Sequence, residues 1–157
     1  MLGGLAVLLL SVGAAVSDDG GEAMRYWPQW RGPLSTGVAP HGNPPAEWSE
    51  TKNVRWKTPL PGSGHSTPIV WGDHVFVTAA VRYGERKLAE SPPVEGTHGN
   101  RPVTQASKFV VLAINRRDGK ILWRKTLRDE RPHERAHYTG TMASNSPVTD
   151  GKSVFAF

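Results

Sequence analysis

From residue 53 onward the chain consists of short runs of β-branched and apolar residues, separated by turns rich in glycine and proline. Gly-Asp or Asp-Gly pairs stand at 72–73, 118–119 and 150–151, and such pairs favour hairpin turns because their backbone accepts positive φ. Phe109–Ile114 is apolar throughout, which predicts a strand buried on both faces. No amphipathic helix is predicted. The expected strands are Val54–Thr58, Thr67–Trp71, His74–Ala80, Lys108–Asn115, Lys120–Thr126, Val148–Thr149 and Ser153–Phe157.

Residues 18–52 have little regular pattern and are interpreted as an irregular N-terminal arm. The proline-bracketed segment Trp27–Pro33 is expected to be extended or turned, because proline fixes φ and removes a backbone donor. Trp27, Trp30 and Trp48 are costly to leave in water, so we expect them to pack this arm onto a larger body. The alternative is an exposed aromatic platform for sugars or bases.

A repeat emerges when the chain is compared with itself. Residues 68–77 match residues 147–156 without a gap, sharing proline, glycine, valine and phenylalanine at the same positions. A second pair matches residues 56–60 with residues 123–127. The unit is a meander of about four strands, whose spacing is lengthened by an inserted surface loop over 81–107. Repeated four-stranded sheets indicate a β-propeller.

The segment Ala113–Trp123 resembles the A-x-D-x-x-T-G-x-x-x-W signature of PQQ-like propeller repeats. Alanine, glycine and tryptophan match in place, whereas Asn115 and Asp118 stand where Asp and Thr are usual. Asn115 can hydrogen-bond the turn backbone, and Gly119 can accept positive φ. The small Ala113 suits close sheet contact, and the closing Trp123 is expected to pack on a neighbouring sheet.

The resemblance implies an all-β partial propeller, with about one complete four-stranded antiparallel blade and parts of two others within residues 53–157. Residues 53–58 would be the last strand of a final blade, 67–126 one whole blade, and 146–157 the first hairpin of the next. The chain is accordingly expected to be an N-terminal fragment of a longer protein. The opening Trp-Pro-Gln-Trp-Arg-Gly-Pro also resembles the arm of exported bacterial members.

The first residues are interpreted as an export signal. The apolar runs Leu5–Leu10 and Val12–Val16 are shorter than the roughly 20 residues that a membrane span needs. Small residues at Ala15–Ser17, ahead of Asp18, fit a signal-peptide cleavage site, although a basic segment at the start is missing. We therefore expect residues 1–17 to be a signal peptide. The mature protein would be periplasmic or extracellular, without a membrane span.

Composition narrows the chemistry. A hydrophobic content of 38% and a charged content of 21% are those of a folded protein. The sequence contains no cysteine, which excludes disulfides, cysteine-based zinc or iron–sulfur sites and a thiol nucleophile. The net charge of +5 is spread along the chain, with local clusters at Arg116–Arg117 and Arg124–Arg128. Nucleic-acid binding is not expected, because it usually requires a basic stripe on one element.

Two motifs attract attention but do not predict catalysis. His133–His137 satisfies H-E-x-x-H, yet Pro132 before it and the charged flanks leave no buried helix to present two zinc ligands. We expect no metal there and interpret it as a solvated connection between blades. Gly62–Ser66 puts serine beside histidine but lacks the strand–turn–helix setting of a nucleophile elbow. It is expected to be a tight, glycine-rich lead into a blade, and no catalytic residue is predicted.

Residues that precede each repeat are the candidate binding residues. In propellers the strand nearest the axis begins each blade, so side chains just before Pro68 and Pro147 should face the central funnel. The candidates are His65, Ser66, Asn145 and Ser146. The alternative is that these polar groups only form turns.

The resemblance suggests different functions. We expect an exported, non-catalytic scaffold that binds a protein partner or a small ligand without a cofactor. The alternative is a quinoprotein-type oxidoreductase that uses pyrroloquinoline quinone (PQQ) and Ca²⁺, with its catalytic residues C-terminal to this sequence. That chemistry requires a cluster of carboxylates and often an adjacent cysteine pair, and neither is evident in this sequence.

Overall fold

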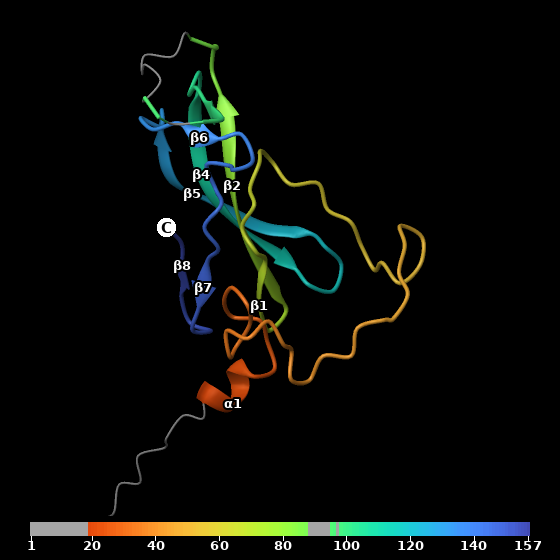
Figure 1. The fold of residues 1–157 in the computed structure, drawn as a ribbon. Helices are drawn as coiled ribbons and strands as arrows, with labels where there is room; N and C mark the ends of the chain where they lie inside the picture. Colours follow the sequence, from red (N-terminus) through yellow and green to blue (C-terminus); the bar gives the residue numbers. More distant parts are fainter. Residues whose placement is uncertain (1–18, 88–94, 97) are drawn as a thin grey trace, which may run out of the picture.

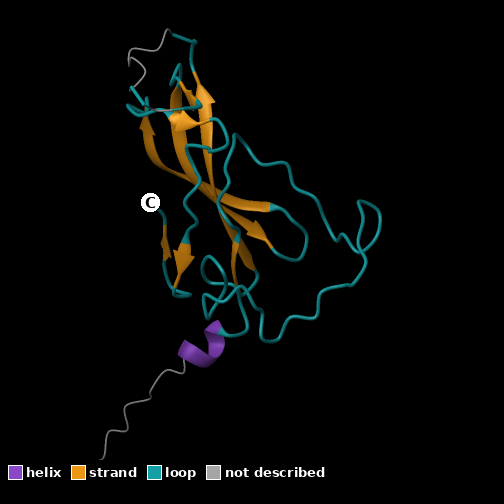
Figure 2. Ribbon diagram, in the orientation of Figure 1, coloured by secondary structure: helices purple, strands orange, loops and turns teal. Residues whose placement is uncertain are grey.

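The computed structural model describes residues 19–87, 95–96 and 98–157, so the expected signal peptide lies outside the described residues. Within this part the protein is all-β apart from the five-residue helix α1, Asp19–Ala23 (Figure 2). No helix of the described residues has the length and apolarity needed to cross a membrane. The strands are β1 Ile69–Trp71, β2 His74–Tyr83, β3 Asn100–Arg101, β4 Ala106–Asn115, β5 Ile121–Glu130, β6 Ala136–His137, β7 Val148–Thr149 and β8 Val154–Phe155.

The main sheet is a four-stranded antiparallel meander in the order β1-β2-β4-β5 (Figure 1). This confirms the predicted four-strand unit. The strands run further than predicted, because the β2–β4 ladder continues through the pairs Arg82↔Ser107 and Tyr83↔Ala106. The inserted loop therefore spans residues 84–105, not 81–107, and the short β3 within it pairs with β6. The ends of both strands contain polar residues, so the pattern of apolar residues did not predict this extension.

Each face of the sheet carries an apolar cluster built from β1, β2 and β4, while β5 is exposed along nearly its whole length. On one face Ile69, Phe76 and Ala113 form a buried cluster. Trp71 of β1 and Val154 of β8 pack against this cluster. The opposite face carries a second cluster that packs against Trp56. Its buried members are Val77, Ala79, Val110, Leu112 and Ile114. The prediction of a doubly buried strand over Phe109–Ile114 is thus confirmed.

The β7–β8 hairpin reproduces the β1–β2 hairpin. Its pairs Val148↔Phe155 and Thr149↔Val154 occupy the same repeat positions as Ile69↔Phe76 and Val70↔Val75. The sequence repeat is therefore also a repeat of strand register. The two copies are joined at an equivalent position, because the Thr67 amide donates a 2.8 Å hydrogen bond to the Ser146 hydroxyl oxygen, 79 residues away.

The N-terminal arm binds along the free edge of β1. Trp27 forms an antiparallel bridge with Val70, in which the two N–H···O distances are 3.1 and 2.7 Å. The next carbonyl, of Pro28, accepts a 2.9 Å hydrogen bond from the Thr149 amide in β7. Val70 and Thr149 are equivalent positions of the two repeats, so the arm holds both hairpins together.

Only one of the three arm tryptophans behaves as predicted. Trp27 is half-buried against the sheet edge, next to the buried Pro28. Trp30 is 62% exposed and Trp48 is 76% exposed, so the prediction that they pack the arm onto the body is wrong. Arg31 instead lies over the Trp30 ring, 5.7 Å from its centroid.

The expected strand at Val54–Thr58 does not form. Side chains, and not a backbone ladder, attach this segment to the β4–β5 turn. The Trp56 indole nitrogen donates to the Arg116 carbonyl at 2.8 Å, and the Thr58 hydroxyl donates to the Gly119 carbonyl at 2.6 Å. The segment was predicted to be a strand of another blade. It contacts the β4–β5 turn through side chains, without strand pairing.

Candidate functional site

The signature turn between β4 and β5 serves structure. The Asn115 side-chain oxygen accepts a 2.8 Å hydrogen bond from the Arg117 amide, as expected for a residue that caps this turn. Gly119 has φ +75° and is buried, and a Cβ there would lie 2.7 Å from Trp56. Both expectations for Asn115 and Gly119 are confirmed.

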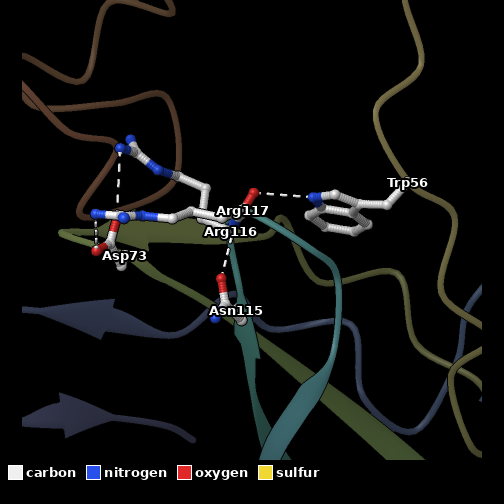
Figure 3. A network of polar contacts seen from close by, with 5 residues as sticks. All are labelled: Trp56, Asp73, Asn115, Arg116 and Arg117. Carbon is white, nitrogen blue, oxygen red and sulfur yellow. Dashed lines mark hydrogen bonds and ion pairs between the residues drawn. The ribbon is translucent and has the colours of Figure 1, made fainter.

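A polar network joins this turn to the β1–β2 turn (Figure 3). Two guanidinium nitrogens of Arg117 donate to the Asp73 carboxylate at 3.1 and 2.7 Å, and the Arg116 amide donates to the Asp73 carbonyl at 2.8 Å. The hydrogen bond from Arg117 holds the pKa of Asp73 below its ordinary value. The Arg117 guanidinium and the Asp73 carboxylate neutralise each other at the surface. We therefore interpret the network as a contact that aligns the two turns.

The expectation for Trp123 is wrong. Its ring does not pack on a neighbouring sheet in the described structure; it is 43% exposed and tilts against Phe76 of its own sheet, with 6.0 Å between ring centroids. The small Ala113 opposite it is fully buried, as expected for close sheet contact.

The sequence-predicted binding residues come together, but mainly as turn-forming groups. The Ser66 hydroxyl accepts from the Thr78 amide at 3.2 Å and lies 3.3 Å from the Thr78 carbonyl. The Ser146 oxygen accepts from the Thr67 amide, and the Asn145 carbonyl accepts from the Thr78 hydroxyl at 3.2 Å. Ser66 and Ser146 therefore connect the segments that precede the two hairpins to β2 and to each other.

Two glycines bring the segment before β1 hard against β2. Gly62 has φ +74°, and a Cβ there would lie 2.3 Å from the Ala80 carbonyl oxygen. At Gly64 a Cβ would lie 2.5 Å from the Thr78 carbonyl oxygen. Between them, Ser63 forms an antiparallel bridge with Ala80. The predicted tight, glycine-rich lead is confirmed, and the close backbone approach fixes the position of the next residue, His65.

Two of the predicted residues have exposed side chains at cavities: Asn145 lines two cavities of about 370 and 680 Å³, and a third cavity is lined by His65. The His65 amide donates to the Ala143 carbonyl at 3.0 Å and lies 3.2 Å from the Thr141 hydroxyl, while its side chain is exposed. The cavity beside it has a volume of about 510 Å³. Its polar and aromatic lining is Ser63, His65, Arg82, Arg101, Tyr138 and Thr141.

Sequence reasoning missed Arg82, Arg101 and Tyr138. Arg82 belongs to the extended end of β2, and Arg101 reaches the cavity because β3 pairs with β6 through Arg101↔Ala136. Tyr138 follows β6 directly, and its amide donates to the Gly99 carbonyl at 2.7 Å. Three separate stretches of chain thus meet, and no local pattern in any of them marks the meeting.

The H-E-x-x-H motif does not adopt the geometry of a zinc site. Its last two residues, Ala136 and His137, form the strand β6 and not a helix. The His137 Nδ1 atom accepts from the Thr139 amide at 3.3 Å. The described ranges contain no group of three or more His, Asp or Glu side chains able to hold a metal ion.

No family model matches this chain, no curated protein is similar to it in sequence, and no solved structure matches its fold.

Proposed function

We propose that this chain builds blades of an exported, PQQ-like β-propeller and acts as a non-catalytic scaffold for a protein partner or small ligand. The observation that carries the proposal is the pair of hairpins with equal register, joined at the equivalent positions Thr67 and Ser146. In a propeller the first strands of consecutive blades lie near one another around the axis, and each blade packs on the face of the next.

The packing of the main sheet supports this arrangement. Val154 of the second hairpin packs on the cluster of Ile69, Phe76 and Ala113, while Trp56 packs on the opposite face. A blade inside a ring needs neighbours on both faces, because each of its faces is apolar. The contacts of Val154 and Trp56 on opposite faces support the proposal that their segments belong to the following and the preceding blade.

The state of the polar groups supports binding over catalysis. The hydroxyls of Ser66 and Ser146 are hydrogen-bonded to backbone groups and hold the segments that precede the two hairpins. His65 lies beside an open cavity whose lining offers hydrogen-bond donors and an aromatic ring. Such a lining suits recognition of a ligand by a rigid frame.

An experimental structure of the protein as its natural gene encodes it tests the architecture. Superposing β7–β8 on β1–β2 should require a rotation of about 45–90° about one common axis, as expected for four to eight blades. A mainly translational relation between the hairpins would exclude the propeller.

A dye-reduction assay with added PQQ and Ca²⁺ tests the absence of catalysis in the same protein. We expect no reduction above that of the quinone alone. Reduction that depends on both Ca²⁺ and protein would overturn the scaffold function in favour of the oxidoreductase.

Export is tested by the mass of the mature N-terminus. After secretion from a Gram-negative host we expect the protein to begin at or near Asp18. A chain that retains Met1 and stays in the cytoplasm contradicts the export proposal.

A further inference from the structure

Two arginines at the His65 cavity are not used by the fold. Arg82 and Arg101 are exposed, and neither guanidinium forms a hydrogen bond or ion pair with any residue that the structure describes. Among other surface arginines, Arg117 pairs with Asp73 at 2.7 Å and Arg128 with Glu130 at 2.9 Å, whereas the exposed Arg124 of β5 also has no partner among the described residues. No described side chain neutralises the charges of Arg82 and Arg101, so both guanidinium groups are available to an anionic ligand.

The rest of the lining has the same preference. His65 and Ser63 add an imidazole and a hydroxyl, and among the described residues no Asp or Glu side chain lines the cavity. Arginine presents a planar fork of donors that matches the oxygen atoms of carboxylates and phosphates. Tyr138 is 55% exposed at the same cavity, and its ring offers a flat apolar surface beside these donors.

The backbone that carries these groups is held in place. Arg82 is paired with Ser107 in the β2–β4 ladder, and Arg101 with Ala136 in the β3–β6 ladder. At Gly99 a Cβ would lie 2.6 Å from the Tyr138 ring, so this ring rests directly on the glycine backbone. Because their backbones are already ordered, the donors lose less conformational entropy when they bind a ligand.

We propose that this cavity is an oxyanion site, in which Arg82 and Arg101 bind the phosphate or carboxylate group of a small ligand. His65 and the Ser63 hydroxyl donate further hydrogen bonds to the anion, and the body of the ligand lies against Tyr138. The inference rests on the proposed binding function and specifies its ligand class.

Fluorine NMR on protein labelled with 3-fluorotyrosine tests the site directly. The sequence has three tyrosines, so three signals are expected, and the Tyr138→Phe variant assigns the one at the cavity. Inorganic phosphate and acetate are titrated separately, with chloride keeping the ionic strength constant. We expect the Tyr138 signal to shift saturably, with a Kd on the order of millimolar because the site is open to solvent.

Charge-removing variants separate the site from general surface attraction. Arg82→Gln and Arg101→Gln should each weaken binding about tenfold or more, as expected for loss of a charge-assisted hydrogen bond. Arg124→Gln removes an equal charge from the exposed strand β5, away from the cavity lining, and should leave binding unchanged. Far-ultraviolet circular dichroism establishes that each variant is folded.

The stronger of the two anions identifies the ligand as a phosphate or a carboxylate compound, and either result supports the site. Two results overturn the proposed oxyanion site. One is a Tyr138 chemical shift that changes linearly with anion concentration, as it would with chloride alone. The other is a loss of binding in Arg124→Gln equal to the loss in Arg82→Gln and Arg101→Gln. Such a failure leaves the scaffold standing, because the scaffold is tested by the rotation between the hairpins and by the dye-reduction assay.

Discussion

Gly151 gives a direct test of the contact between the two hairpins. It lies in the β7–β8 turn with φ +87°, and a Cβ there would lie 2.4 Å from two atoms of the Trp71 ring. Gly72 has the equivalent position in the β1–β2 turn, with φ +56° and no other group within 4 Å of such a Cβ. Replacing each by alanine therefore imposes a similar backbone cost, and only Gly151→Ala adds a collision between the repeats.

The expected magnitudes follow from these two environments. An alanine in the left-handed region costs about 1–2 kcal/mol, which applies to both variants. Carbon atoms pack at about 3.5–4.0 Å, so the Trp71 ring must move by more than an ångström in Gly151→Ala. That ring also packs against Tyr26, with 5.2 Å between centroids, which restricts its movement. Overpacking of this kind adds about 1–3 kcal/mol.

Urea unfolding followed by tryptophan fluorescence measures the difference. Gly72→Ala should lower the free energy of unfolding by about 1–2 kcal/mol, and Gly151→Ala by about 2–5 kcal/mol. Equal losses in the two variants would show that Trp71 does not rest on the second turn. The hairpins would then not be stacked, and the proposed propeller would lose the contact on which it depends.

Three further predictions concern the sheet and its turns. Leu112→Ala, at a fully buried position, should lower the free energy of unfolding by about 2–5 kcal/mol, whereas Leu122→Ala on exposed β5 should change it little in the same urea assay. Trp56→Phe removes one hydrogen bond to the β4–β5 turn and should cost about 1 kcal/mol, measured the same way. Because Arg117 lowers the native pKa of Asp73, this carboxylate stabilises the fold above its ordinary pKa of 3.8, and the contribution disappears as pH falls through the lowered value. The melting temperature of Asp73→Asn should accordingly lie below wild type at about pH 7 and approach it at about pH 2, and a difference independent of pH contradicts this account.

The local features of the sheet were predictable. The turn pairs Gly72-Asp73 and Asp150-Gly151 mark both hairpins, and a short turn of fixed type sets the register of the strands that it connects. Asn115 and Gly119 shape their turn by side-chain hydrogen bonding and positive φ, which depend on the neighbouring residues only.

Burial of isolated aromatic residues was not predictable. Trp27, Trp30 and Trp48 all stand in an irregular arm, yet only Trp27 meets a free strand edge and becomes half-buried. The hydrophobicity of a tryptophan determines how much free energy its burial would contribute. It does not determine whether the fold places an apolar surface close enough to bury the ring. The same is true of Trp123, whose partner is the ring of Phe76 in its own sheet.

The sequence by itself determined the four strands of the main sheet, the β7–β8 hairpin, their turns, the repeat and the position of His65 next to the glycines that bring its segment close to β2. Those features depend on residues that are neighbours or that recur at one spacing. Only the tertiary structure decided the composition of the cavity, because Arg82, Arg101 and Tyr138 meet there through the extended β2–β4 ladder and the β3–β6 pairing. Contacts between distant segments depend on how the inserted loop folds back, and no periodicity within the loop encodes that path.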